Sequence, residues 1–257
     1  MSASGIVIAV LSGGFVGVVY KSSQGRAAWF RSQMIESSEE FVAAAFEAQD
    51  ALERLLRALQ RWSKAEERVG ASMDGLRALY GEEQAPESVL TMLDVSHQTL
   101  TRVHTYLFAD QPDAHDRTDS ALAEAARRLE ALSPEEVGAD GVSHLHEWLD
   151  LLTRWVSWAG VVRAEVARSN EAASETERAR SRVTLLFAGR RRSAEVLLAA
   201  DAVLAALRRV DGVCRKAMDG PLSEEDETQR AGALRDLGTA RDRFATAANS
   251  AARRSLL

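Results

Sequence analysis

One pattern constrains the fold of this chain more than any other. From Phe41 to Trp62 the apolar residues recur at alternating steps of four and three, at Phe41, Ala45, Ala48, Leu52, Leu55, Leu59 and Trp62. That spacing places them on one face of an α-helix, as in the seam of a helical bundle or a coiled coil. Val42 and Leu56 widen the stripe, which favours a bundle over a two-stranded coil. The pattern therefore predicts a long amphipathic helix that packs against other helices.

Composition supports helices for the rest of the chain. Only 4 of the 257 residues are proline, which helix interiors exclude. A hydrophobic content of 46% excludes a disordered chain, and the single cysteine, Cys214, excludes a disulfide scaffold. The sparse turn residues argue against an all-β sandwich. A net charge of -6 argues against nucleic acid as the main partner.

Further apolar stripes predict the remaining helices. They fall at residues 89–107, 122–132, 145–166, 196–217 and 234–251. Gly70 and Gly75 weaken the end of the first helix, and Gly220-Pro221 ends the helix that Ser193 begins. We expect an all-α fold: an N-terminal transmembrane helix followed by an elongated antiparallel bundle of about five to six helices.

The N-terminal segment has the composition of a membrane anchor. Residues 1–20 carry no charged side chain, and as a helix they reach about 30 Å, the thickness of the hydrocarbon core. Lys21, Arg26 and Arg31 follow, with no acidic residue before Glu36. By the positive-inside rule the chain after the span stays in the cytoplasm. We expect residues 1–24 to anchor the protein in the inner (plasma) membrane with its N-terminus outside, and residues 25–257 to form a cytoplasmic bundle.

The same segment admits other interpretations. A cleaved signal peptide would carry its basic residues before the apolar stretch rather than after it. The run Ser12–Gly17 imitates a dinucleotide-binding turn but lacks the first glycine of that motif. Gly13 and Gly17 form a GxxxG pair, which is typical of helices that pack together in a membrane. A first helix that packs into a soluble bundle is a further alternative.

Several short segments carry a resemblance to a known class of proteins. They are the anchor with its basic flank, Trp29–Arg31, Phe41–Ala45, Leu185–Gly189 and Ala240–Phe244. With these segments the chain resembles uncharacterised, N-terminally membrane-anchored, all-helical proteins of GC-rich actinobacteria. The class has no known activity, so the resemblance implies a membrane-anchored helical architecture and no catalytic residues.

The candidates for metal or ligand binding are few. Asp94 and His97 are spaced like one arm of a di-iron bundle site, but a second arm and two further carboxylates are missing. His97 and His104 lie about 10 Å apart along a helix, too far to share one ion. Cys214 falls within an apolar stripe, where a lone cysteine is usually a core residue. Trp148 and Trp155 lie on one helix face, which suits core packing, although a pocket between helices could also use them.

A cluster of arginines is the most informative charged feature. It comprises Arg178, Arg180, Arg182, Arg190, Arg191 and Arg192, with no acidic residue between its ends. It could be a solvated face. If successive helices alternate in direction, the cluster instead returns to the end of the bundle that carries Lys21, where it would contact the anionic leaflet. If the short third helix does not cross the bundle, the cluster faces the cytosol.

No set of residues converges on catalytic chemistry. We therefore expect a non-enzymatic membrane protein whose bundle is an interaction or scaffolding module. Its partners would be the membrane and either an unidentified protein or a second copy, with no cofactor. The alternative is a helical-bundle enzyme or sensor that binds a metal or small ligand through Asp94, His97 and the tryptophans.

Overall fold

The computed structural model describes most of the chain. The described residues are 4–80, 86, 87, 89–91, 94, 98, 99, 103, 113–132, 134–188 and 193–254. Within them the backbone alone is described at residues 4–24, 26, 27, 113–118, 134, 136, 139, 193 and 254. The predicted span, residues 1–24, therefore lies outside the residues whose side chains are described.

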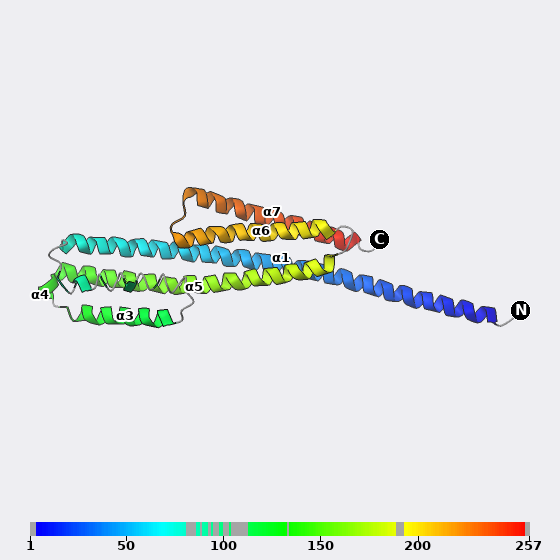
Figure 1. The fold of residues 1–257 in the computed structure, drawn as a ribbon, viewed down its shortest axis with the longest axis horizontal. Coiled ribbons are helices and arrows are strands. Elements are labelled where there is room, and N and C mark those ends of the chain that lie inside the picture. The colour runs from blue at the N-terminus through cyan, green and yellow to red at the C-terminus, as the bar shows by residue number, and fades with distance from the viewer. Residues whose placement is uncertain are drawn as a thin grey trace. The chain divides into compact units, whose positions relative to one another are not determined.

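Every regular element in the described part of the chain is a helix, which confirms the predicted all-α class. In chain order the helices are α1 (Ser4–Tyr80), α3 (Asp113–Glu130), α4 (Pro134–Val137), α5 (Ala139–Phe187), α6 (Ser193–Asp219) and α7 (Glu224–Arg254). Neighbouring long helices pack as antiparallel pairs (Figure 1). Helices α5, α6 and α7 cover the predicted stripes, whereas the helix predicted at 89–107 falls mostly on residues outside the description.

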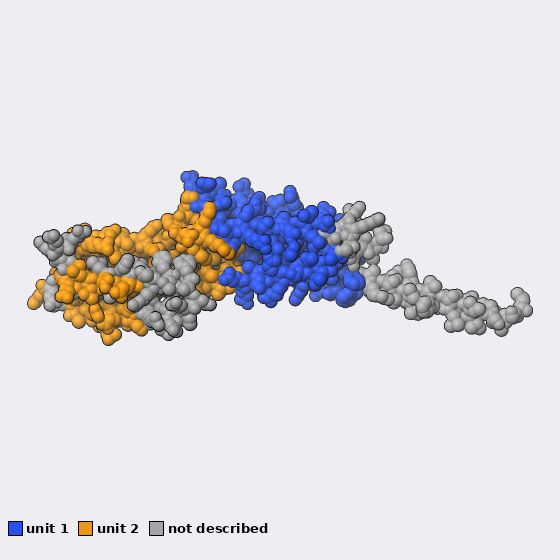
Figure 2. Space-filling view, viewed as in Figure 1, with its two compact units in different colours: residues 1–50, 170–213, 224–257 blue, residues 51–169, 214–223 orange. Residues whose placement is uncertain are grey.

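The helices form two compact units, coloured separately in Figure 2. Unit 1 comprises residues 1–50, 170–213 and 224–257, and unit 2 comprises residues 51–169 and 214–223. Helices α1 and α5 each contribute one part to unit 1 and the other part to unit 2. Each unit has its own core.

Unit 1 is a four-helix arrangement in which each helix contacts two antiparallel neighbours. Between α1 and α5, the Thr176 hydroxyl donates a hydrogen bond to the Ala44 carbonyl at 3.1 Å. Arg180 of α5 forms an ion pair with Asp201 of α6 at 2.8 Å. Phe244 of α7 packs edge-on against Phe41 of α1, with ring centroids 4.7 Å apart. The contacts therefore close a ring in the order α1, α5, α6, α7.

The core of unit 1 follows the sequence stripes. Its fully buried large side chains are Met34, Phe41, Phe187 and Phe244. On α5 the buried face continues past the predicted stripe through small and polar residues, among them Ala172, Thr176 and Ala179. Burial of each large apolar side chain stabilises the fold by about 1.5–3 kcal/mol, so these residues contribute to the packing of α1, α5 and α7.

Unit 2 has a tryptophan-rich core. Trp62 of α1 stacks on Trp155 of α5, with ring centroids 5.6 Å apart and planes 20° apart. Trp148 is fully buried one heptad earlier on α5. The expectation that Trp148 and Trp155 pack in the core is confirmed. Cys214 is also buried, and its Sγ atom lies 3.5 Å from the Leu52 carbonyl oxygen.

One close approach fixes the end of α1. The helix continues through Gly70 and Gly75 to Tyr80, whose hydroxyl donates a hydrogen bond to the Val137 carbonyl at 2.9 Å. Burial raises the pKa of the Tyr80 hydroxyl. A Cβ atom at Gly141 would lie only 1.6 Å from the Tyr80 hydroxyl oxygen, so this position accepts no larger residue without displacing the tyrosine.

Candidate functional site

The predicted basic flank and helix-packing pair lie near the start of α1. Gly13 and Gly17 belong to the helical backbone of α1, but their surroundings lie outside the description. The side chains of Lys21 and Arg26 are likewise outside it. Arg31 is half-buried, and beside it Trp29 and Phe30 form an edge-on pair with centroids 5.0 Å apart. Trp29 is 56% exposed, unlike the buried tryptophans of unit 2.

The described part of the arginine cluster is tied into unit 1. Arg182 forms an ion pair with Glu40 of α1 at 2.8 Å, and Arg180 forms the pair with Asp201 of α6. Arg178 donates a hydrogen bond to the Ser174 hydroxyl at 3.5 Å. Arg190, Arg191 and Arg192 lie outside the described residues. Acidic residues from neighbouring helices therefore neutralise two members of a cluster that has none in its own sequence.

The contacts between α1 and α5 also establish which end of this helix pair the C-terminal part of α5 approaches. Thr176 lies opposite Ala44 on α1, and Arg182, six residues later, lies opposite Glu40. As α5 proceeds toward Phe187, its level therefore moves toward the beginning of α1. Within unit 1 the end of α5 and the N-terminal part of α1 share one end of the helix pair.

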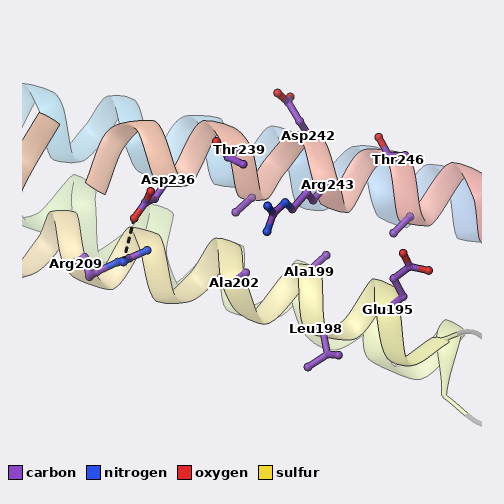
Figure 3. Close-up of a pocket in the computed structure, with 12 residues that line it drawn as sticks. Glu195, Leu198, Ala199, Ala202, Arg209, Asp236, Thr239, Asp242, Arg243 and Thr246 are labelled. Carbon is purple, nitrogen blue, oxygen red and sulfur yellow. Dashed lines mark ion pairs between the residues drawn. The ribbon is translucent and has the colours of Figure 1, made fainter. Parts of the chain in front are cut away.

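A groove between α6 and α7 forms a cavity in the described part of unit 1 (Figure 3). Its volume is about 830 Å³. The lining residues are Glu195, Leu198, Ala199, Ala202 and Arg209 of α6, and Asp236, Thr239, Ala240, Asp242, Arg243, Thr246 and Ala247 of α7. Small side chains are frequent along both helices, which leaves the space open. The rim residue Leu198 is 69% exposed.

Charges are placed unevenly along this groove. Arg209 and Asp236 form an ion pair across one end, at 3.1 Å, and each side chain is 56% exposed. Arg243 extends from α7 toward α6 near the middle of the groove, and Glu195 of α6 lies toward its other end (Figure 3). Within the described part of the chain, neither Glu195 nor Arg243 has a charged partner. Asp242, which also lines the groove, is likewise without a charged partner among the described residues. The groove thus combines one ion pair with three exposed charges that are not paired within the described part of the chain.

The predicted metal and ligand candidates do not come together. Asp94 is exposed and accepts a hydrogen bond from Gln98 at 3.0 Å, while His97 and His104 lie outside the description. His146 makes a local contact with the Val142 carbonyl at 2.8 Å, and His144 lies 4.0 Å from Glu147. Among the residues that the structure describes, no three possible metal ligands cluster.

Side-chain ionisation offers little chemistry elsewhere. A hydrogen bond from Arg128 and the charge of Arg127 lower the pKa of Glu124 on α3, a surface effect of neighbouring turns. Trp148 and Trp155 are enclosed by the core of unit 2. Trp158 is half-exposed, with the Arg61 guanidinium 5.3 Å from its ring centroid.

The chain matches no protein-family model, no curated protein and no solved structure. Over the residues that are described with their side chains, none of the helices offers an apolar stretch long enough to cross a membrane.

The groove is the feature that sequence reasoning missed. Its signal is weak, because alanines on α6 and α7 occur on both the buried and the exposed faces. Ala200 is fully buried whereas Ala202, two residues later, lines the groove. Only the rotation of each helix distinguishes the two positions.

Proposed function

We propose that this chain is a non-enzymatic, single-pass membrane protein whose helical bundle is an interaction module on the cytoplasmic side. The observation that carries the proposal is the uncharged segment at residues 1–20, followed directly by Lys21, Arg26 and Arg31. Helix α1 runs without interruption from Ser4 into unit 1. The proposed anchor and the bundle would therefore share one helix, which couples the position of unit 1 to the membrane.

Distance along α1 limits which cations can act on the leaflet. Arg26 lies six residues beyond Tyr20, or about 9 Å, which is within the headgroup region or just outside it. Arg182 lies level with Glu40, twenty residues or about 30 Å beyond Tyr20. Electrostatic attraction is screened within about 8 Å at physiological ionic strength. We therefore assign leaflet contact to Lys21 and Arg26 rather than to Arg178, Arg180 or Arg182.

The remaining arginines of the cluster stay a prediction. In the sequence, Arg190, Arg191 and Arg192 follow α5, and they lie outside the described residues. If they come close to the leaflet, each would contribute about 1 kcal/mol of attraction.

The interaction role is supported by the surface of unit 1. The α6–α7 groove lies open, carries unsatisfied charges and has an exposed leucine at its rim. Small residues on both helices allow another backbone to approach closely. A scaffold needs such a surface on a rigid element, and α6 and α7 are rigid because their opposite faces pack in the core.

Carbonate extraction of membranes tests the anchor in the full-length chain. We expect the chain to resist extraction, and we expect Val16→Arg to release it, because a central arginine costs about 2.5–3.5 kcal/mol of insertion. Val16→Leu is the matched control and should stay in the membrane. Recovery of the unaltered chain in the soluble fraction would contradict the proposal, and a first helix packed into the bundle would replace it.

A further inference from the structure

Four of the five charged residues that line the α6–α7 groove follow a two-fold pattern, and the fifth, Asp242, has no counterpart in it. On α6, Glu195 and Arg209 have opposite signs and their midpoint is Ala202. On α7, Asp236 and Arg243 have opposite signs and their midpoint falls between Thr239 and Ala240. Ala202 and Thr239 lie level with each other across the groove (Figure 3). The two midpoints therefore coincide along the groove, although they belong to different helices.

A half-turn about an axis through these midpoints makes the groove complementary to itself. A second copy placed by that rotation runs antiparallel, with α6 on α6 and α7 on α7. Glu195 of each copy then faces Arg209 of the other, and Asp236 of each faces Arg243 of the other. We infer that the partner of this groove is the same groove of a second copy of the chain. The inference deepens the proposed interaction role by naming the partner.

The charge pairing within a single copy also supports a second copy as the partner. Glu195 and Arg243 have no charged partner among the described residues, whereas Arg209 and Asp236 already pair at 3.1 Å. In the two-fold arrangement the Arg209–Asp236 pair of each copy faces Glu195 and Arg243 of the other copy. Each half of the interface, on either side of the axis, then holds two positive and two negative charges. Such networks contribute more to the stability of an interface than isolated surface ion pairs do. Closed two-fold contacts of this kind are the commonest protein assemblies.

The shape of the groove suits the same partner. Around the axis the side chains are small, with Ala199, Ala202 and Ala240 lining the groove. Helices with small residues at the contact approach toward the short end of the usual 8–10 Å spacing. Leu198, which is 69% exposed, would be covered by the second copy. The face is about 21 Å long, so the interface is small and we expect a dissociation constant in the range of about 1–100 μM.

Antiparallel packing also determines the direction of the two chains. Helix α1 runs parallel to α6 in unit 1, so the α1 helices of the two copies point in opposite directions (Figure 1). If the chains are anchored by residues 1–20, such a pair joins two membrane surfaces that face each other. Copies anchored side by side in the same membrane surface have parallel α1 helices and could not form this antiparallel pair.

Charge reversal in the full-length chain, purified in detergent, tests the pairing by sedimentation velocity. Glu195→Arg alone places two arginines opposite each other at both ends, and Arg209→Glu alone places two glutamates there. We expect each variant to dimerise at least about tenfold more weakly than the unaltered chain. An equal mixture of the two variants should dimerise again, because opposite charges then face each other at both ends of the mixed pair. Glu175→Arg, at an exposed position of α5 outside the groove lining, should leave the dimer intact.

The controls separate this inference from the proposed function. A chain that stays monomeric at about 500 μM, well above the expected dissociation constant, would overturn the inference, whereas membrane anchoring is measured independently by carbonate extraction. A dimer that both single variants retain would also overturn it and would direct attention to Gly13 and Gly17. Failure of the mixture to restore association would contradict the two-fold register. Both substitutions are at exposed positions, and circular dichroism of each variant verifies that it remains folded.

Discussion

The two units share α1 and α5 but differ in what fills the space between helices. In unit 2, Trp62 stacks on Trp155 between α1 and α5, and both rings are enclosed, as is Trp148. In unit 1, alanines and threonines line the outer side of α6 and α7, and a groove of about 830 Å³ remains. The difference teaches that side-chain size between neighbouring helices decides whether a pair closes into core or leaves a surface for another molecule.

The largest expected effect concerns the tryptophan core. Trp155→Ala removes the ring that stacks on Trp62 and should lower the free energy of unfolding by about 3–5 kcal/mol. Trp158→Ala, at a half-exposed position one turn later, should cost considerably less. Urea unfolding followed by circular dichroism measures both. Equal losses would show that the stacked pair does not organise unit 2.

A matched pair of alanines on α6 sharpens the contrast inside unit 1. Ala200→Leu inserts methyl groups into a filled core and should destabilise the fold by about 1–3 kcal/mol. Ala202→Leu extends into the groove, so it should change the stability by less than about 0.5 kcal/mol. Thermal unfolding of the two variants distinguishes core from groove. A large loss at Ala202 would mean that the groove is closed in solution.

Replacing either of two glycines of α5 by alanine should change the stability by a smaller amount, and the two changes should have opposite signs. Gly141→Ala displaces the Tyr80 hydroxyl and breaks its hydrogen bond to Val137, which should cost about 1 kcal/mol. Gly160→Ala meets nothing within 4 Å and should stabilise the helix by up to about 1 kcal/mol. In a Tyr80→Ala background the cost at Gly141 should largely disappear. If it persists there, the clash with Tyr80 is not its cause.

The ion pairs of unit 1 should contribute less than any of these. A double-mutant cycle on Arg182→Gln and Glu40→Gln should give a coupling of about 0.2–1 kcal/mol, because both side chains are exposed. Raising the salt concentration to about 1 M should reduce it through screening. A coupling that salt leaves unchanged would indicate that the pair is desolvated.

The smallest effect is a pH dependence in unit 2. The pKa of Tyr80 is raised by burial, so the folded state favours the neutral hydroxyl. The resulting stabilisation is complete below the unfolded pKa of about 10 and is lost as pH rises through the folded value. Above about pH 10 the unaltered chain should therefore lose more stability than Tyr80→Phe does. Parallel curves for the two chains would exclude Tyr80 as the source.

Apolar periodicity was sufficient to predict most of the fold. The stripe from Phe41 to Trp62 is buried throughout, and α6 begins at the predicted Ser193. The apolar stripe predicted for α5 ended at Val166, whereas the buried face continues beyond it, because Ala172 and Thr176 are small or polar and do not stand out as core residues. Gly70 and Gly75, which were expected to weaken the first helix, lie within α1, which continues to Tyr80, because helix packing outweighs a propensity cost of about 1 kcal/mol each.

The candidate site could not be predicted in the same way. Glu40 and Arg182 are 142 residues apart, so the acidic partners of the arginine cluster are invisible in its local sequence. The groove depends on how far α6 and α7 are rotated about their axes, and alanines on both faces leave that rotation unspecified by the pattern. The structure was therefore needed to identify which side chains of different helices lie next to each other.

Accessibility of single introduced cysteines tests the central claim most directly, and the burial of Cys214 keeps the background low. The account predicts that a membrane-impermeant maleimide labels Ser2→Cys in intact cells. It predicts that Glu225→Cys, at an exposed position of α7, is labelled only after the cells are permeabilised. Labelling of Glu225→Cys in intact cells, or of neither variant until permeabilisation, would contradict a single span with the bundle inside.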